Sequence, residues 1–133
     1  MSTTVTMRRA VRPGTVVLWV VQVVLASQFV MAGLMKLSGN PGMVEMFGNV
    51  GAGQWLRYLV GALEVAGALG LLIPRLCGPA ALGLVALMAG AIVTNVFVLG
   101  ESPAIPLAYL LVAGVIAWLR RSALASAFGI LRR

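Results

Sequence analysis

The sequence contains no histidine and only one cysteine, Cys77, among its 133 residues. A single thiol excludes an intrachain disulfide and a Cys-x-x-Cys redox pair. The lack of histidine removes the commonest metal ligand, the usual haem ligand and the usual base at neutral pH. We therefore expect no metal and no cofactor held by this chain.

Acidic residues are scarce as well, because three Asp+Glu stand against ten Lys+Arg, for a formal net charge of +7. Charged residues make up only 10% of the chain and hydrophobic residues 61%, whereas a soluble domain is about a quarter charged and about half apolar. This composition indicates a membrane protein whose main surroundings are the lipid bilayer. The basic residues flank apolar runs and set orientation there, so no nucleic-acid partner is expected.

The apolar residues fall into four runs of helical length, separated by short breaks. At 1.5 Å per residue, each run crosses most or all of the hydrocarbon core of a bilayer. Residues 41–49, between the first two runs, resemble a short interfacial helix. The sequence therefore predicts an all-α fold, a four-helix transmembrane bundle with an interfacial helix between helices 1 and 2. The predicted spans are residues 15–37, 55–73, 79–99 and 105–119.

The basic N-terminus followed by an apolar run resembles a signal peptide, with residues 24–26 as its cleavage site. The run continues to Leu37, however, which is longer than the apolar part of a signal peptide. We therefore expect an uncleaved first transmembrane helix. The predicted organisation is a cytoplasmic segment (1–14), a transmembrane domain (15–119) and a cytoplasmic basic amphipathic tail (120–133).

The distribution of basic residues predicts the orientation. With four spans, only Lys36 and Arg57 lie toward one side, and the other eight Lys+Arg lie toward the opposite side. The side richer in Lys and Arg is the cytoplasmic one. The sequence thus predicts a multi-pass protein of the cell inner (plasma) membrane with both termini in the cytoplasm.

Glu64 lies near the middle of the second run, about 13 Å from its outer end at 1.5 Å per residue. An ionisable group at that depth costs several kcal/mol unless it is neutralised or paired, which makes it a candidate functional residue. Lys36 and Arg57 lie nearer the outer end, and either could be its partner. The predicted catalytic residues are Glu64 and Lys36, and the predicted substrate-binding residues are Gln28, Arg57, Asn95 and Tyr109.

These polar residues come from all four predicted helices and most lie in the outer half, whereas the inner half is almost entirely aliphatic, with Gln22 as the exception. The pattern predicts a polar pocket that opens outward and has Glu64 at its floor. Simpler explanations stay open for each residue. Lys36 and Arg57 can extend to the interface, the amides and Tyr109 can form interhelical hydrogen bonds without chemistry, and Glu64 can be a structural acid bound to a cation.

Three motifs, GLMKL at 33–37, LEVAG at 63–67 and LLIPR at 71–75, resemble successive signatures of DoxX-like membrane proteins. The similarity extends from about Phe29 through the fourth span. The resemblance implies a four-helix transmembrane bundle and a link to quinone- or thiol-related oxidoreductase complexes. Many members of that family carry a histidine near the end of the third helix, where this chain has Asn95, so any proton or metal chemistry of that histidine is missing here.

The leading functional hypothesis is binding of a small lipophilic molecule, with acid–base chemistry such as ring opening, cyclisation or isomerisation. None of these reactions needs a cofactor, and a positioned carboxyl group can donate or accept the proton. Tyr109, Asn95 and Gln28 would hold a developing oxyanion. The alternatives are a membrane subunit of a quinone- or thiol-linked oxidoreductase complex, a non-catalytic scaffold and a proton-coupled transporter. A homo-oligomer and a membrane complex partner both remain open.

Overall fold

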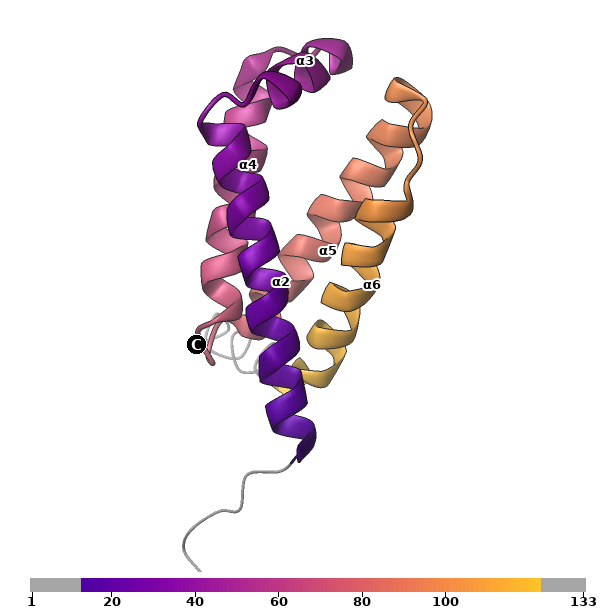
Figure 1. The fold of residues 1–133 in the computed structure, drawn as a ribbon. Coiled ribbons are helices and arrows are strands. Elements are labelled where there is room, and N and C mark those ends of the chain that lie inside the picture. Colours follow the sequence, from indigo (N-terminus) through magenta and orange to yellow (C-terminus); the bar gives the residue numbers. More distant parts are fainter. Residues whose placement is uncertain (1–12, 123–133) are drawn as a thin grey trace, which may run out of the picture.

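The computed structural model describes residues 13–122, and this part of the chain folds into helices joined by turns (Figure 1). The expected all-α fold is confirmed. The predicted N-terminal segment and basic tail lie largely outside the described residues. The elements are α2 (Pro13–Leu37), α3 (Pro41–Val50), α4 (Gln54–Leu71), α5 (Cys77–Thr94), the π-helix η1 (Asn95–Leu99) and α6 (Ala104–Leu119).

The short helix α3 is defined by its ends. The side chain of Asn40 accepts a hydrogen bond from the backbone N–H of Gly42 at 3.0 Å, and Pro41 occupies the first helical position, where its missing N–H has no consequence. Gly51 ends the helix with φ +82°, a left-handed conformation that glycine adopts without strain. The expected helix at 41–49 is therefore present, within one residue of its predicted end.

The long helices associate in two antiparallel pairs, α2 with α4 and α5 with α6. Contacts between α4 and α5 join the pairs. In Figure 1 the two pairs diverge toward the end of the bundle that carries α3. We call this the α3 end and call the end with the α4–α5 turn the opposite end.

The core is made of side chains from all four long helices, and most of them are small or aliphatic. On α2 the buried positions recur at spacings of three and four residues, so one face of that helix is turned inward. This face includes Phe29 and Gly33, as the sequence pattern indicates. The core cluster consists of Leu25, Ala26, Phe29, Ala68, Leu71, Ala81, Leu84, Met88, Ala113 and Ile116.

Two of the described helices, Pro13–Leu37 and Cys77–Leu99, are long and apolar enough to cross a membrane, and Ala104–Leu119 is apolar but shorter. In the most apolar part of the two longer helices only 28% and 11% of residues are buried within the protein. Core helices of a soluble protein would be mostly buried, so these exposed apolar surfaces fit a lipid environment. The number of spans stays a prediction.

The third predicted span differs from a regular α-helix. The α-helix begins at Cys77, two residues earlier than expected, and changes at Asn95 into the single π-turn η1. Gly100 ends η1 with φ +64°, and the N–H of Glu101 donates to the carbonyl of Asn95 at 2.8 Å. Hydropathy could not reveal this wider turn because residues 96–99 are all apolar. π-turns frequently occur near functional sites.

Candidate functional site

Two glycines bring the backbones of α2 and α4 together. A Cβ atom added to Gly33 would lie 2.6 Å from Val65 Cγ2 and 2.7 Å from the carbonyl oxygen of Gly61. A Cβ added to Gly61 would lie 3.0 Å from both the Gly33 carbonyl oxygen and Lys36 Cβ. Larger residues would hold the helices apart, so these glycines fix the separation at which side chains near the crossing can meet.

The ammonium group of Lys36 and the carboxylate of Glu64 form an ion pair beside this crossing, with 2.8 Å between Nζ and Oε1. Their side chains are only 12% and 3% exposed. Glu64 lies ten residues into α4, about 15 Å along it, which is half the thickness of a bilayer core. The partner of Glu64 is thus Lys36, whose ammonium group lies against the buried carboxylate.

Arg57 is buried, at 5% exposure, and supports the pair through the backbone. Its Nη1 donates to the carbonyl oxygen of Lys36, in the last turn of α2, and its Nε donates to Gln54 Oε1 at 2.8 Å. Carbonyls in the last turn of a helix have no partner within the helix, and a cation near them is favourable. Arg57 therefore holds the main chain of Lys36 in place from the first turn of α4.

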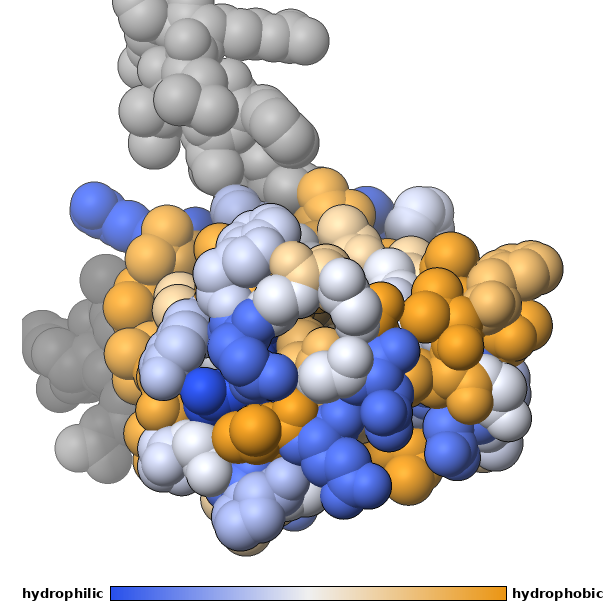
Figure 2. Space-filling model, turned by 90° about the horizontal axis from the view of Figure 1, so that it is seen from above, coloured by the Kyte–Doolittle hydropathy of each residue, from blue (hydrophilic) through white to orange (hydrophobic). Residues whose placement is uncertain are grey.

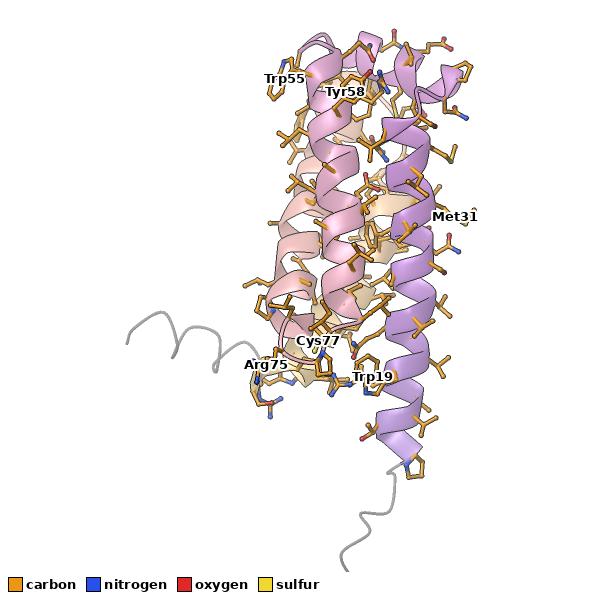
Figure 3. The ribbon with its side chains drawn as sticks, turned by 90° about the vertical axis from the view of Figure 1, so that its left-hand side faces the viewer. Trp19, Met31, Trp55, Tyr58, Arg75 and Cys77 are labelled. Atoms are coloured by element: carbon orange, nitrogen blue, oxygen red, sulfur yellow. The ribbon has the colours of Figure 1, made fainter. Side chains whose placement is uncertain are left out.

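The α3 end is tied together by two further interactions. Gln54 Nε2 donates to the carbonyl oxygen of Val44 at 3.0 Å, which joins α4 to α3. The guanidinium of Arg57 lies 4.3 Å from the centroid of the Tyr58 ring, a favourable cation–π distance. Tyr58 and Trp55 lie at the α3 end in Figure 3, near the start of α4.

Gln28 and Tyr109 contact each other. The Tyr109 hydroxyl donates to Gln28 Oε1 at 3.3 Å, and its ring packs on Phe29 with 5.3 Å between centroids. Gln28 is exposed and Tyr109 is half-buried. This polar contact joins α2 to α6 across the two helix pairs.

Asn95 lies in η1 and lines a groove of about 710 Å³ between α3 and the segment that leads into α6. Its amide nitrogen donates to the carbonyl oxygen of Ser102 at 3.1 Å. Figure 2 shows the α3 end face-on, with hydrophilic residues gathered between apolar margins. Lys36 and Glu64 are not among the residues that line this groove.

The six predicted site residues thus form three groups. Lys36 and Glu64 touch directly, and Arg57 joins them through the Lys36 carbonyl. Gln28 and Tyr109 form a second contact, and Asn95 lies in the groove. A single pocket with Glu64 at its floor stays a prediction.

Sequence reasoning missed a polar cluster around Gln22. This amide is fully buried, its Nε2 donates to the carbonyl oxygen of Leu71 at 2.7 Å, and its Oε1 accepts from Arg120 Nε at 2.9 Å. The guanidinium of Arg120 also lies 5.0 Å from the centroid of the Trp19 ring. The sequence did place Gln22 on the same face of its helix as Phe29, which indicates that both are buried. A buried amide needs hydrogen-bond partners, so a polar cluster could have been expected there.

The chain matches a known protein family over most of its length. Residues 20–130 match the DoxX-like family, so this helical bundle with exposed apolar faces belongs to it and is a DoxX-like membrane protein. The resemblance carried by the three motifs is thereby confirmed. No curated protein and no solved structure gave a match to the chain.

Proposed function

We propose that this protein crosses the membrane four times and binds a small lipophilic molecule, on which the Lys36–Glu64 pair moves a proton. The observation that carries the proposal is the buried 2.8 Å contact between Nζ and Oε1. A buried ion pair adds little stability over well-packed apolar residues. Two ionisable groups at this depth therefore favour a functional role.

The chemistry follows from the two members of the pair. The Glu64 carboxylate takes a proton from an acidic carbon or hydroxyl of the ligand, while the Lys36 ammonium stabilises the oxyanion that develops. Glu64 then returns the proton at a different atom, so that substrate and product have the same composition. Isomerisation, cyclisation and ring opening all fit this balance, because none of them requires a net transfer of electrons.

The surrounding residues keep the pair in place. The Gly33–Gly61 crossing sets the distance between the two helices, and Arg57 holds the Lys36 main chain. A polar group of the ligand would replace part of the contact between Nζ and Oε1. The hydroxyl of Tyr109 and the amides of Gln28 and Asn95 are the proposed supporting donors, and the first two already bond to each other.

The proposed topology places the α3 end outside and both termini in the cytoplasm of a cell whose inner (plasma) membrane holds the protein. Trp55 lies at the α3 end, and Trp19 and Arg75 lie toward the opposite end (Figure 3). Tryptophans near both interfaces, with arginine on the cytoplasmic side, support this orientation.

The test is to purify the full chain with its bound lipophiles and to compare wild type with Glu64→Gln and Arg75→Gln. The exposed Arg75 is the control, because its removal changes one charge far from the pair. Compounds enriched with wild type are identified by mass spectrometry, added back, and followed for conversion. We expect wild type and Arg75→Gln to convert the compound at equal rates and Glu64→Gln to bind it with conversion reduced at least a hundredfold.

Equal conversion by Glu64→Gln would refute the catalytic role. A folded wild-type protein that enriches no lipophile would favour a scaffold. The DoxX-like resemblance also implies an oxidoreductase subunit, and copurification of a flavin- or sulfur-handling partner would favour that alternative.

A further inference from the structure

The groove at the α3 end has two distinct walls. One wall is a single face of α3, formed by residues at spacings of three and four, and the buried Phe47 lies on another face of that helix. The other wall comes from η1, the loop after it and the start of α6. The lining residues from α3 are Gly42, Glu45, Met46 and Asn49.

Each wall contributes one carboxylate and one amide, Glu45 with Asn49 on α3 and Glu101 with Asn95 opposite. Within residues 13–122 the ion pair found is Lys36–Glu64, so neither groove carboxylate has a cationic partner there. A cleft lined by charges of one sign with low-dielectric walls concentrates its field. The groove therefore attracts cations.

The same groove has an apolar part, formed by Met46, Val98, Leu99 and Ile105. Its volume of about 710 Å³ lies within the range of about 300–1,000 Å³ typical of small-molecule sites. A divalent metal fits less well, because the described residues contain no group of three His, Cys, Asp or Glu side chains placed to hold one. The apolar part of the groove also supplies none of the oxygen ligands that hard cations need.

We infer that this groove binds a lipophilic monocation, with the charged centre between Glu45 and Glu101 and the apolar body against η1 and α6. The site is separate from the Lys36–Glu64 pair and shares only Asn95 with the residues proposed above. If it fails, the proposed acid–base function is unaffected, because neither groove carboxylate takes part in that chemistry.

The test measures binding of tetraphenylphosphonium to the full chain in lipid nanodiscs by equilibrium dialysis, with tetraphenylborate as an anion of similar size. Glu45→Gln and Glu101→Gln should each weaken tetraphenylphosphonium binding about three- to fivefold, as expected for partly solvated charge pairs. Asn49→Lys should weaken it at least tenfold. Ser38→Lys adds the same charge at the same end but outside the groove, so it should leave the affinity within twofold.

Added salt should weaken tetraphenylphosphonium binding to the wild-type protein, because the attraction is electrostatic. Any one of four results would overturn the inference, and three of them concern the variants and the anion. They are unchanged affinity after both Glu→Gln substitutions, equal loss in Asn49→Lys and Ser38→Lys, and binding of tetraphenylborate as tight as that of the cation. Displacement of tetraphenylphosphonium by sub-millimolar Ca²⁺ would also overturn it, in favour of a metal site.

Discussion

At the scale of single residues, Gly33 determines whether Lys36 and Glu64 can meet. A side chain at this position would collide with the carbonyl oxygen of Gly61, and backbone cannot move aside as a flexible side chain can. We predict that Gly33→Ala lowers the free energy of unfolding by about 1–3 kcal/mol, the usual cost of overpacking. Thermal unfolding in detergent micelles measures the change.

The control is Gly90→Ala, which lies four residues before the end of α5 as Gly33 does in α2, and where an added Cβ meets nothing within 4 Å. This substitution should be neutral or stabilising by up to about 1 kcal/mol, because alanine is the better helix former. Equal destabilisation by both variants would show that close approach at Gly33 is not the cause.

The ion pair itself can be tested by a double-mutant cycle. Lys36→Met leaves the Glu64 carboxylate buried without its partner, and breaking a buried pair in this way costs about 3–5 kcal/mol. We predict that Lys36→Met combined with Glu64→Gln is more stable than Lys36→Met alone. Additive losses in chemical or thermal unfolding would mean that the two groups do not interact.

The sequence could not predict which cation pairs with Glu64. Position along the helices placed both Lys36 and Arg57 near the outer side of Glu64. Which of them pairs with Glu64 depends on how α2 and α4 cross. It also depends on the Lys36 carbonyl, which has no partner within α2 and accepts a hydrogen bond from Arg57. These are tertiary features, and helical spacing alone contains neither.

At the scale of helices, hydrophobic runs and Gly/Pro breaks located each long helix to within about two residues. The exception is the end of α5, where the change to a π-turn is a matter of backbone hydrogen bonding and leaves no mark in hydropathy. The short helix α3 was predictable because Pro41 and Gly51 mark its ends.

At the opposite end, Gln22 on α2 hydrogen-bonds to Leu71 at the end of α4 and to Arg120, which directly follows α6. We predict that Gln22→Leu lowers the free energy of unfolding by about 1–3 kcal/mol, because it leaves the Leu71 carbonyl and Arg120 Nε without their partner. Gln28→Leu, at an exposed position on the same helix, should change it by less than about 0.5 kcal/mol. Similar losses in thermal unfolding would contradict this role of Gln22.

At the scale of the whole molecule, the proposed topology requires that the α3 end faces outward. Cys77 is buried, so a Cys77→Ala background removes the native thiol with little change to the surface. In that background we predict that Glu45→Cys reacts with a membrane-impermeant maleimide in intact cells, whereas Arg75→Cys reacts only after permeabilisation. If both cysteines react from the same side of the membrane, α4, which lies between them, does not cross it.

Composition and apolar periodicity were sufficient for the fold class, and three short motifs pointed to the family, because each of these is a pattern along the chain. The grouping of the site residues was not predictable in the same way. Asn95 was expected in a pocket with Glu64 at its floor because it lies in the outer half of its helix, yet it bonds to Ser102 and lines a groove that neither member of the pair lines. Depth along a helix fixes height in the bundle but not the direction of the side chain around it.

The central claim is that Lys36 and Glu64 together handle a proton on a lipophilic ligand. The most direct test is an experimental structure of the protein with its copurified lipophile in a lipid environment. The account predicts a polar atom of the ligand within hydrogen-bonding distance of Lys36 Nζ or a Glu64 carboxylate oxygen. A ligand bound elsewhere, with the 2.8 Å contact between Nζ and Oε1 intact, would contradict it.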